Sequence, residues 1–170
     1  FTKNKKAYFV KFNKNFFMDC KTIFFSINNL IMILNTTHID KEKKDLINKL
    51  VGNPLSLWES LFQNKGSHRM IIESFSEKFN KFFKTYNNLL YANIEIRKKG
   101  IIIRISINNE TVSWLVPFYK LTIYNSSLFS IHSNGNNIKF RKDRYYKINK
   151  NFINSLIEQK AFHSKKFDIS

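Results

Sequence analysis

The feature that most constrains the fold of this chain is a long segment in which apolar and polar residues alternate. It starts at Asn93 and continues to Phe140, and turn signals divide it into runs of strand length. Alternation with a period of two predicts strands with one covered and one solvated face. Because short connections join neighbouring antiparallel strands, the segment predicts a meander of about six strands. The turn signals lie at Lys98-Lys99-Gly100, Asn108-Asn109, Asn125-Ser126 and Asn134-Gly135.

Within the meander, the alternation also predicts which side chains face the core. Ile101, Ile103 and Ile105 share one face of their strand, and Arg104 and Ser106 lie on the other. The same pattern puts Val112, Trp114 and Val116 on one face of the next strand, opposite Ser113 and Leu115. Pro117 marks a bend or a strand edge, because proline cannot donate to a ladder.

Helix signals precede the meander. Asp40 is a candidate N-cap and Gly52 a candidate stop for a first helix. A second helix is expected from Asn53 as N-cap and Pro54 as first helical residue, with Trp58 on its apolar face as a core anchor. The two helices predict a short helical hairpin over residues 38–69.

A longer amphipathic helix is expected over residues 74–91. Ser74 and Glu77 have the spacing of a capping box, and apolar residues recur every three or four positions. Lys78, Lys81 and Lys84 fall on the opposite side. A last amphipathic helix, over about residues 147–161, uses Ile148, Phe152, Ile153, Leu156 and Ile157.

The predicted fold class is therefore α+β, with N-terminal helices, a long amphipathic helix, an antiparallel meander and a C-terminal helix. Residues 1–37 form a basic and apolar leader, residues 38–69 the hairpin, and residues 70–170 an α+β domain. Residues 1–21 carry six lysines and one aspartate, and residues 22–37 carry no charge. This pattern permits a targeting segment, a leader outside the native fold, or a strand or helix that packs on the domain. The chain starts at Phe1, so Met18, Met32 and Met70 are each a candidate true start.

The net charge of +17, from 29 basic and 12 acidic residues, indicates nucleic acid, an anionic membrane or an acidic protein as partner. A second explanation stays open. Lys, Asn, Ile and Phe are abundant and have A/T-rich codons, so a biased genome could produce the same composition. The excess is mostly lysine, and arginine, the better residue for bidentate phosphate contacts, occurs only at 69, 97, 104, 141 and 144.

Sequence signatures of catalysis are missing. The chain has no Walker-type or dinucleotide-binding glycine motif, no H-E-x-x-H and no G-x-S-x-G. The single cysteine, Cys20, excludes an internal disulfide and indicates a reducing compartment. His132 is expected on the polar side of its strand as an ordinary surface residue. We therefore expect no enzyme activity, catalytic residue, cofactor, metal or small-molecule substrate.

One segment has the composition of a binding site. Between residues 139 and 150, cations alternate with two tyrosines, a combination that can contact a phosphate backbone and stack on bases. The alternative is the solvated rim of a sheet, with the tyrosines closing it against the last helix. The candidate residues are Lys139, Arg141, Lys142, Arg144, Tyr145, Tyr146, Lys147 and Lys150.

The strings VSWLVPFYKLTIY (residues 112–124) and LFSIHSNGNNIKF (residues 128–140) resemble strand patterns of small uncharacterised bacterial proteins with a pleckstrin-homology-like (PH-like) fold. The resemblance covers about residues 70–160 and implies a compact scaffold for proteins, lipids or peptides. Two features depart from it: a long helix is expected before the strands, and no residues match the basic lipid-binding loop of eukaryotic members. The resemblance therefore implies no lipid site.

These observations favour a non-catalytic binding module that acts through a basic surface, with a protein or an anionic membrane as partner. The alternative is an RNA- or DNA-associated protein that uses residues 139–150, with Lys78, Lys81 and Lys84 as further phosphate contacts. The expected location is the cytoplasm, either free or at a membrane surface.

Overall fold

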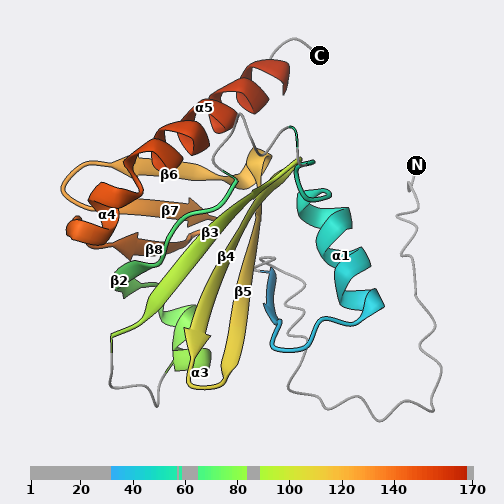
Figure 1. Cartoon of the computed structure of the whole chain (residues 1–170), viewed down its shortest axis with the longest axis horizontal. Coiled ribbons are helices and arrows are strands. Elements are labelled where there is room, and N and C mark those ends of the chain that lie inside the picture. The colour runs from blue at the N-terminus through green and yellow to red at the C-terminus, as the bar shows by residue number, and fades with distance from the viewer. Residues whose placement is uncertain (1–31, 57, 59–64, 84–88, 168–170) are drawn as a thin grey trace, which may run out of the picture.

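A single antiparallel sheet of eight strands organises the fold (Figure 1). The computed structural model describes residues 32–56, 58, 65–83 and 89–167. The strands are β1 (Met32–Asn35), β2 (Met70–Phe75), β3 (Tyr91–Arg97), β4 (Gly100–Ile107), β5 (Glu110–Pro117), β6 (Thr122–Asn125), β7 (Phe129–Ser133) and β8 (Asn136–Phe140). The helices are α1 (Lys41–Val51), α3 (Asn80–Phe83), α4 (Arg144–Ile148) and α5 (Lys150–Phe167), with 3-10 turns η1 (Glu77–Phe79) and η2 (Phe118–Lys120). The prediction of an α+β protein with an antiparallel sheet and a C-terminal helix is confirmed.

The sheet has the strand order β1-β5-β4-β3-β2-β8-β7-β6 and bends at β2. The first residues of β2 pair with β3, through Met70 opposite Ala92. The later residues pair with β8, and the register shifts between Ile72 and Ser74. Figure 1 shows β6, β7 and β8 crossing β3, β4 and β5 steeply. A bulge of this kind increases the local twist, so β2 connects two differently oriented parts of one sheet.

The main core lies on the face of the sheet that α3 and α5 cover. Phe79 and Trp114 meet edge to face, with their ring centroids 5.1 Å apart. Phe118 stacks on His163 of α5 at 4.4 Å. The alternating residues of the meander fill the space between, as predicted: Ile101, Ile103, Ile105, Val112, Trp114, Val116, Phe129, Ile131, Ile138 and Phe140 are all buried there.

The opposite face of β4 and β5 is covered as well. Helix α1 packs Ile47 and Val51 against Ile102 and Leu115, together with Met32 and Leu34 of β1. The predicted N-cap of this helix is confirmed, because the Asp40 carboxylate accepts a hydrogen bond from the Lys43 amide at 2.7 Å. Gly52 ends it with φ of 82°, as the sequence indicated. The expectation of a solvated second face is therefore wrong for this part of the sheet.

The four turn signals are all confirmed as connections between consecutive strands. The β7–β8 hairpin turns at Asn134 and Gly135, both with positive φ (50° and 72°), which is the geometry of a two-residue turn in a twisted hairpin. Asn108, with φ of 53°, makes the corresponding turn between β4 and β5. Pro117 ends β5, so its missing amide hydrogen removes no further ladder bond.

The predicted long helix over residues 74–91 is wrong. Ser74 belongs to β2, opposite Lys139 of β8, and helical structure is described only from Glu77 to Phe83. The capping-box spacing was misleading, because the residue that precedes the helical turn is Ser76 and its hydroxyl accepts a hydrogen bond from the Asn137 amide instead of capping the turn. Residues 84–88 lie outside the described part of the chain, and Tyr91 already starts β3.

The hairpin and leader predictions fall partly on residues that the structure does not describe. The first helix of the hairpin is α1, but Pro54 does not start a second one: it forms an isolated bridge with Arg97. Trp58 is 75% exposed and is not a core anchor. Residues 1–31 lie outside the description, whereas residues 32–35 form β1, which pairs with β5. The division into leader, hairpin and domain stays a prediction.

The C-terminal helix is divided at Asn149. Phe152, Ile153 and Leu156 enter the core as predicted, but Ile148 is 62% exposed. The reason is local: α4 ends at Asn149, whose ψ of 5° breaks the helical path before α5 begins. The periodicity of α5 therefore does not extend back to Ile148.

Candidate anion-binding surface

The N-cap residue Asp143 fixes the start of helix α4. The Asp143 carboxylate accepts hydrogen bonds from the backbone amides of Tyr145 at 2.9 Å and Tyr146 at 3.2 Å. A helix of five residues has little stability of its own, so this cap and the packing of Tyr146 determine its orientation. Tyr146 contacts Phe129 of β7 at 6.1 Å between ring centroids, and its hydroxyl donates to the Asn125 side chain at 2.9 Å.

Two parts of the chain that are distant from α4 in the sequence contact it: the residue before β2 and the first residue of β3. Arg69, just before β2, lies over the ring of Tyr91 at 5.2 Å and over that of Tyr145 at 5.5 Å. Arg144 lies over Tyr145 at 5.0 Å and donates a hydrogen bond to its hydroxyl at 3.2 Å. The two tyrosine rings meet edge to face at 6.2 Å. We call these four residues the Tyr145 cluster.

The electrostatics of the cluster are dominated by its two guanidinium groups. Hydrogen bonds from Arg144 and Arg69, followed by the positive charge of Arg144, lower the pKa of the Tyr145 hydroxyl below its usual value of 10.0. Both arginines are exposed. Within the described part of the chain, neither forms a salt bridge, and their charge is available to a partner.

The other three arginines are paired with carboxylates. Arg141 Nε lies 2.6 Å from Glu73 on β2. Arg97 and Arg104 both contact Glu95 on the face of the sheet that carries α1. Arg97 Nε is 2.5 Å from a Glu95 oxygen, although the two groups lack the alignment of a hydrogen bond. Burial lowers the pKa of Arg97, and the nearby Glu95 opposes that shift.

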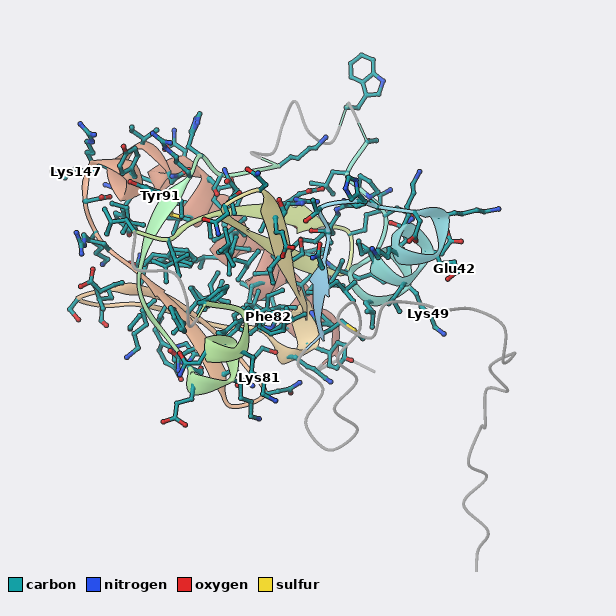
Figure 2. All side chains as sticks on the ribbon, turned by 90° about the horizontal axis from the view of Figure 1, so that it is seen from below. Glu42, Lys49, Lys81, Phe82, Tyr91 and Lys147 are labelled. Carbon is teal, nitrogen blue, oxygen red and sulfur yellow. The ribbon has the colours of Figure 1, made fainter. Side chains whose placement is uncertain are left out.

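Beside the Tyr145 cluster, α4 exposes further cations around an apolar side chain. Arg144, Lys147 and Ile148 have i, i+3 and i+4 spacing and share one side of α4. Lys150 follows at the exposed start of α5. Figure 2 shows Lys147 and Tyr91 at the same end of the molecule. We call the Tyr145 cluster with Lys147, Ile148 and Lys150 the basic surface.

The structure brings only part of the predicted segment 139–150 together. Arg144, Tyr145, Lys147 and Lys150 belong to the basic surface. Lys142 and Tyr146 connect α4 to the β6–β7 turn, because the Lys142 ammonium donates to the Ser126 carbonyl and lies 5.3 Å over the Tyr146 ring. Arg141 is paired with Glu73, and Lys139 lies on the outer face of β8.

The lysines proposed as additional phosphate contacts lie elsewhere. Lys78 and Lys81 are exposed on η1 and α3, and Figure 2 places Lys81 at a different end of the molecule from Lys147. Lys84 lies outside the described residues. Sequence reasoning missed Arg69 and Tyr91, because nothing near them in the chain indicates that they meet α4. It assigned Ile148 to the apolar face of the last helix, whereas the structure leaves this side chain exposed.

His132 lies on the outer face of the β6–β8 part of the sheet, as predicted. Its Nε2 is 3.0 Å from the Ser130 hydroxyl, and the Tyr124 ring meets it edge to face at 4.9 Å. Burial, and then the positive charge of Lys139, lower its pKa below the usual 6.5. A cationic imidazole is therefore disfavoured at this position.

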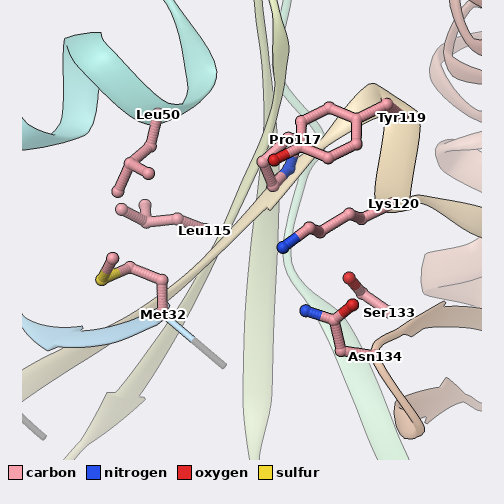
Figure 3. Close-up of a pocket in the computed structure, with 8 residues that line it drawn as sticks. All are labelled: Met32, Leu50, Leu115, Pro117, Tyr119, Lys120, Ser133 and Asn134. Atoms are coloured by element: carbon pink, nitrogen blue, oxygen red, sulfur yellow. The ribbon is translucent and has the colours of Figure 1, made fainter. Parts of the chain in front are cut away.

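A small cavity lies where β1 and α1 approach the end of β5 (Figure 3). Its volume is about 50 Å³, and it is lined by Met32, Leu50, Leu115, Pro117, Tyr119, Lys120, Ser133 and Asn134. Such a volume has room for about one water molecule. It is too small for an organic ligand.

Among the residues that the structure describes, no three His, Cys, Asp or Glu side chains gather as metal ligands would. No helix in the same ranges has the length and apolar character needed to cross a bilayer. Comparison of the chain with protein-family models, curated proteins and solved structures found no match.

Proposed function

We propose that this chain is a non-catalytic binding module whose basic surface docks on an anionic membrane. One observation carries the proposal: of five arginines, three pair with carboxylates, whereas Arg69 and Arg144 both lie over Tyr145 without such a partner in the described structure. A guanidinium has five N–H donors, so packing against the Tyr145 ring and a hydrogen bond to its hydroxyl orient each arginine and leave other donors for a partner. Two distant arginines held in this way are suited to a phosphate-bearing partner.

The exposed apolar residue in this surface favours a membrane. Ile148, 62% exposed, is surrounded in sequence by Arg144, Lys147 and Lys150. An apolar side chain among cations can enter the acyl boundary while the cations contact lipid phosphates. Each basic residue near an anionic leaflet contributes about 1 kcal/mol. Tyrosines are suited to the headgroup level, where Tyr91 and Tyr145 would lie.

A second candidate is nucleic acid, favoured by the edge-to-face pair of Tyr91 and Tyr145 beside two guanidinium groups that have no carboxylate partner among the described residues. Aromatic rings next to cations bind single strands through stacking and phosphate contacts. The same residues would act in both cases, so the experiment includes both partners.

The PH-like assignment also belongs to this proposal. Three observations support it: the domain begins with strand β2 where a helix was expected, β2 is shared by two strand groups, and α5 closes the core. The first of these removes one departure from the resemblance. A location in the cytoplasm, at the inner face of a membrane, completes the proposal.

The test is co-sedimentation of the full chain with phosphatidylcholine vesicles, with and without phosphatidylserine, and a parallel titration of labelled single-stranded RNA. The double variant Arg69→Gln/Arg144→Gln removes two charges from the basic surface. A matched control, Lys41→Gln/Lys44→Gln, removes two from exposed positions of α1. We expect binding to phosphatidylserine vesicles that the first pair weakens about 30-fold, at about 1 kcal/mol per charge, and that the control leaves nearly unchanged.

Equal losses in both double variants would show that only the diffuse net charge acts, and the proposal would be wrong. RNA binding that falls steeply from about 50 to about 200 mM salt, without vesicle binding, would replace the membrane with nucleic acid. Ile148→Ser separates the two partners further, because it removes apolar contact with a bilayer but no charge.

A further inference from the structure

The sheet ends at β6, and this edge has little of the usual protection against pairing with another chain. In the described strand order, β6 is the last strand and pairs with β7. Exposed edges are usually protected by lysines, prolines or bulges, because unpaired N–H and C=O groups accept a further strand. The sequence of β6, Thr-Ile-Tyr-Asn, contains no charge and no proline. The edge is short, and no strand of the described sheet pairs with its outer side.

A groove of about 370 Å³ runs between β6 and α5. On the strand side it is lined by Leu121, Thr122, Ile123 and Asn125. On the helix side it is lined by Ile157, Lys160 and Ala161. Figure 1 shows α5 running obliquely past β6 in the upper part of the view. Ile157 is 38% exposed although it lies next to the core residue Leu156. The groove is therefore lined mainly by apolar side chains and lies beside the β6 edge of the sheet.

The charge around the groove indicates the chemistry of its occupant. Lys160 is the only charged residue in the described lining, and its ammonium group donates to the Ser164 hydroxyl at 3.0 Å. Within the described structure it forms no salt bridge, so its ammonium group can donate to a carboxylate of a partner. A second copy of this chain fits poorly, because two proteins with a net charge of +17 repel each other.

We propose that the groove between β6 and α5 binds an extended, acidic peptide segment of a protein partner. The segment adds to the sheet as a strand alongside β6, which gives affinity through main-chain hydrogen bonds. Alternate side chains enter the groove, where an apolar one contacts Ile123 and Ile157 and a carboxylate reaches Lys160. The four residues of β6 match a segment about 13 Å long, at 3.3 Å per residue. This site is independent of the basic surface.

The experiment starts from a display library of random peptides selected on the full chain at physiological salt. The most enriched peptide is then synthesised with a fluorophore, and its affinity is measured by anisotropy. Lys160→Glu reverses the charge of the groove, and Lys44→Glu on α1 is the control for net charge. Ala161→Trp fills the groove from an exposed position, and Asn154→Trp, also exposed on α5, is the control for size.

We expect enriched peptides in which acidic and apolar residues alternate. Lys160→Glu and Ala161→Trp should each weaken binding about tenfold or more, whereas both controls keep the original affinity. The peptide is also made with alternate N-methyl amides in each of the two possible phases. An added strand directs every second N–H at its neighbour, so one phase should abolish binding and the other preserve it.

Three results would overturn the proposal. The first is the absence of any enriched peptide, or enrichment of basic peptides. The second is a peptide whose affinity is the same in the two groove variants and their controls, or in both N-methyl phases. The third is a dimer, seen by analytical ultracentrifugation, that Ala161→Trp dissociates, since the occupant would then be a second copy. Circular dichroism of each variant shows that the fold is intact. We expect vesicle binding to be the same in each groove variant and its control, so failure here leaves the proposed function standing.

Discussion

At the scale of single residues, the arginines fall into two groups. Three pair with carboxylates of the sheet, and two pack on the Tyr145 ring. Glu95 pairs with both Arg97 and Arg104, and Glu73 pairs with Arg141, on the surface of the sheet. Arg69 and Arg144 lie over Tyr145, which orients them without neutralising them. The sequence shows five arginines and the neighbouring tyrosines Tyr145 and Tyr146, but the contacts of Arg141 with Glu73 and of Arg69 with Tyr145 join distant parts of the chain. Local spacing therefore could not separate Arg141 from Arg144.

A pH-dependent prediction also belongs to this scale. Lys139→Gln removes the charge that helps to lower the pKa of His132, while the larger cause, burial, remains. We expect the pKa of His132 to rise but to stay below 6.5. An NMR titration of the His132 Cε1 proton measures it, with Lys44→Gln as the control that leaves the titration unchanged. An unchanged His132 titration in Lys139→Gln would contradict the assigned cause.

The sign of the linked stability follows from the direction of the shift. Folding favours the neutral imidazole, because the pKa of His132 is lower in the folded protein than its ordinary 6.5. The corresponding contribution to the free energy of unfolding is complete above pH 6.5 and is lost as pH falls through the folded-state value. Lys139→Gln should make that loss smaller.

At the scale of elements, local signals predicted both ends of α1 but not the pairing of β2. Asp40 and Gly52 bound α1 because a cap acts within a few residues of itself. The strand β2 was missed because its partner, β8, lies far along the chain, and the pairing of Ser74 with Lys139 leaves no local trace. The Ser74–Glu77 spacing then favoured a helix that tertiary pairing overrides.

Helix α4 gives a test at this scale, because its cap positions the basic surface. Asp143→Ala should cost about 1 kcal/mol in the free energy of unfolding and weaken vesicle binding several-fold, as Arg144 and Tyr145 lose their orientation. Asp40→Ala removes the same charge and an equivalent cap from α1, and it should cost similar stability without affecting vesicles. Chemical denaturation and co-sedimentation measure the two effects. Vesicle binding by Asp143→Ala that equals that of Asp40→Ala would show that the cap does not position the surface.

At the scale of the whole molecule, one strand joins two parts of the sheet. The meander from β3 to β8 was predictable from alternation and turns, because each hairpin is local. The covering of the second face of β4 and β5 by α1 was not predicted, although Ile102 and Leu115 carried a signal. Apolar residues at positions assigned to solvent indicate a strand that is covered on both faces.

The shared strand predicts a single cooperative unit. The core cluster includes Trp114 from one part of the sheet and Phe129 and Phe140 from the other, and β2 pairs with both parts. Hydrogen exchange followed by NMR should therefore give one opening free energy for the most protected amides of β4 and β7. Faster exchange throughout β6, β7 and β8 would instead show that this part opens as a separate unit.

One of the two tryptophans is buried and the other is exposed, so their fluorescence can be distinguished. Trp114 is 1% exposed in the core beside Phe79, whereas Trp58 is 75% exposed. An indole in an apolar environment emits at shorter wavelength than one in water, and a dissolved quencher reaches only the second. The blue component of the spectrum therefore reports on the packing between the sheet and η1, and the red component on the segment that follows α1.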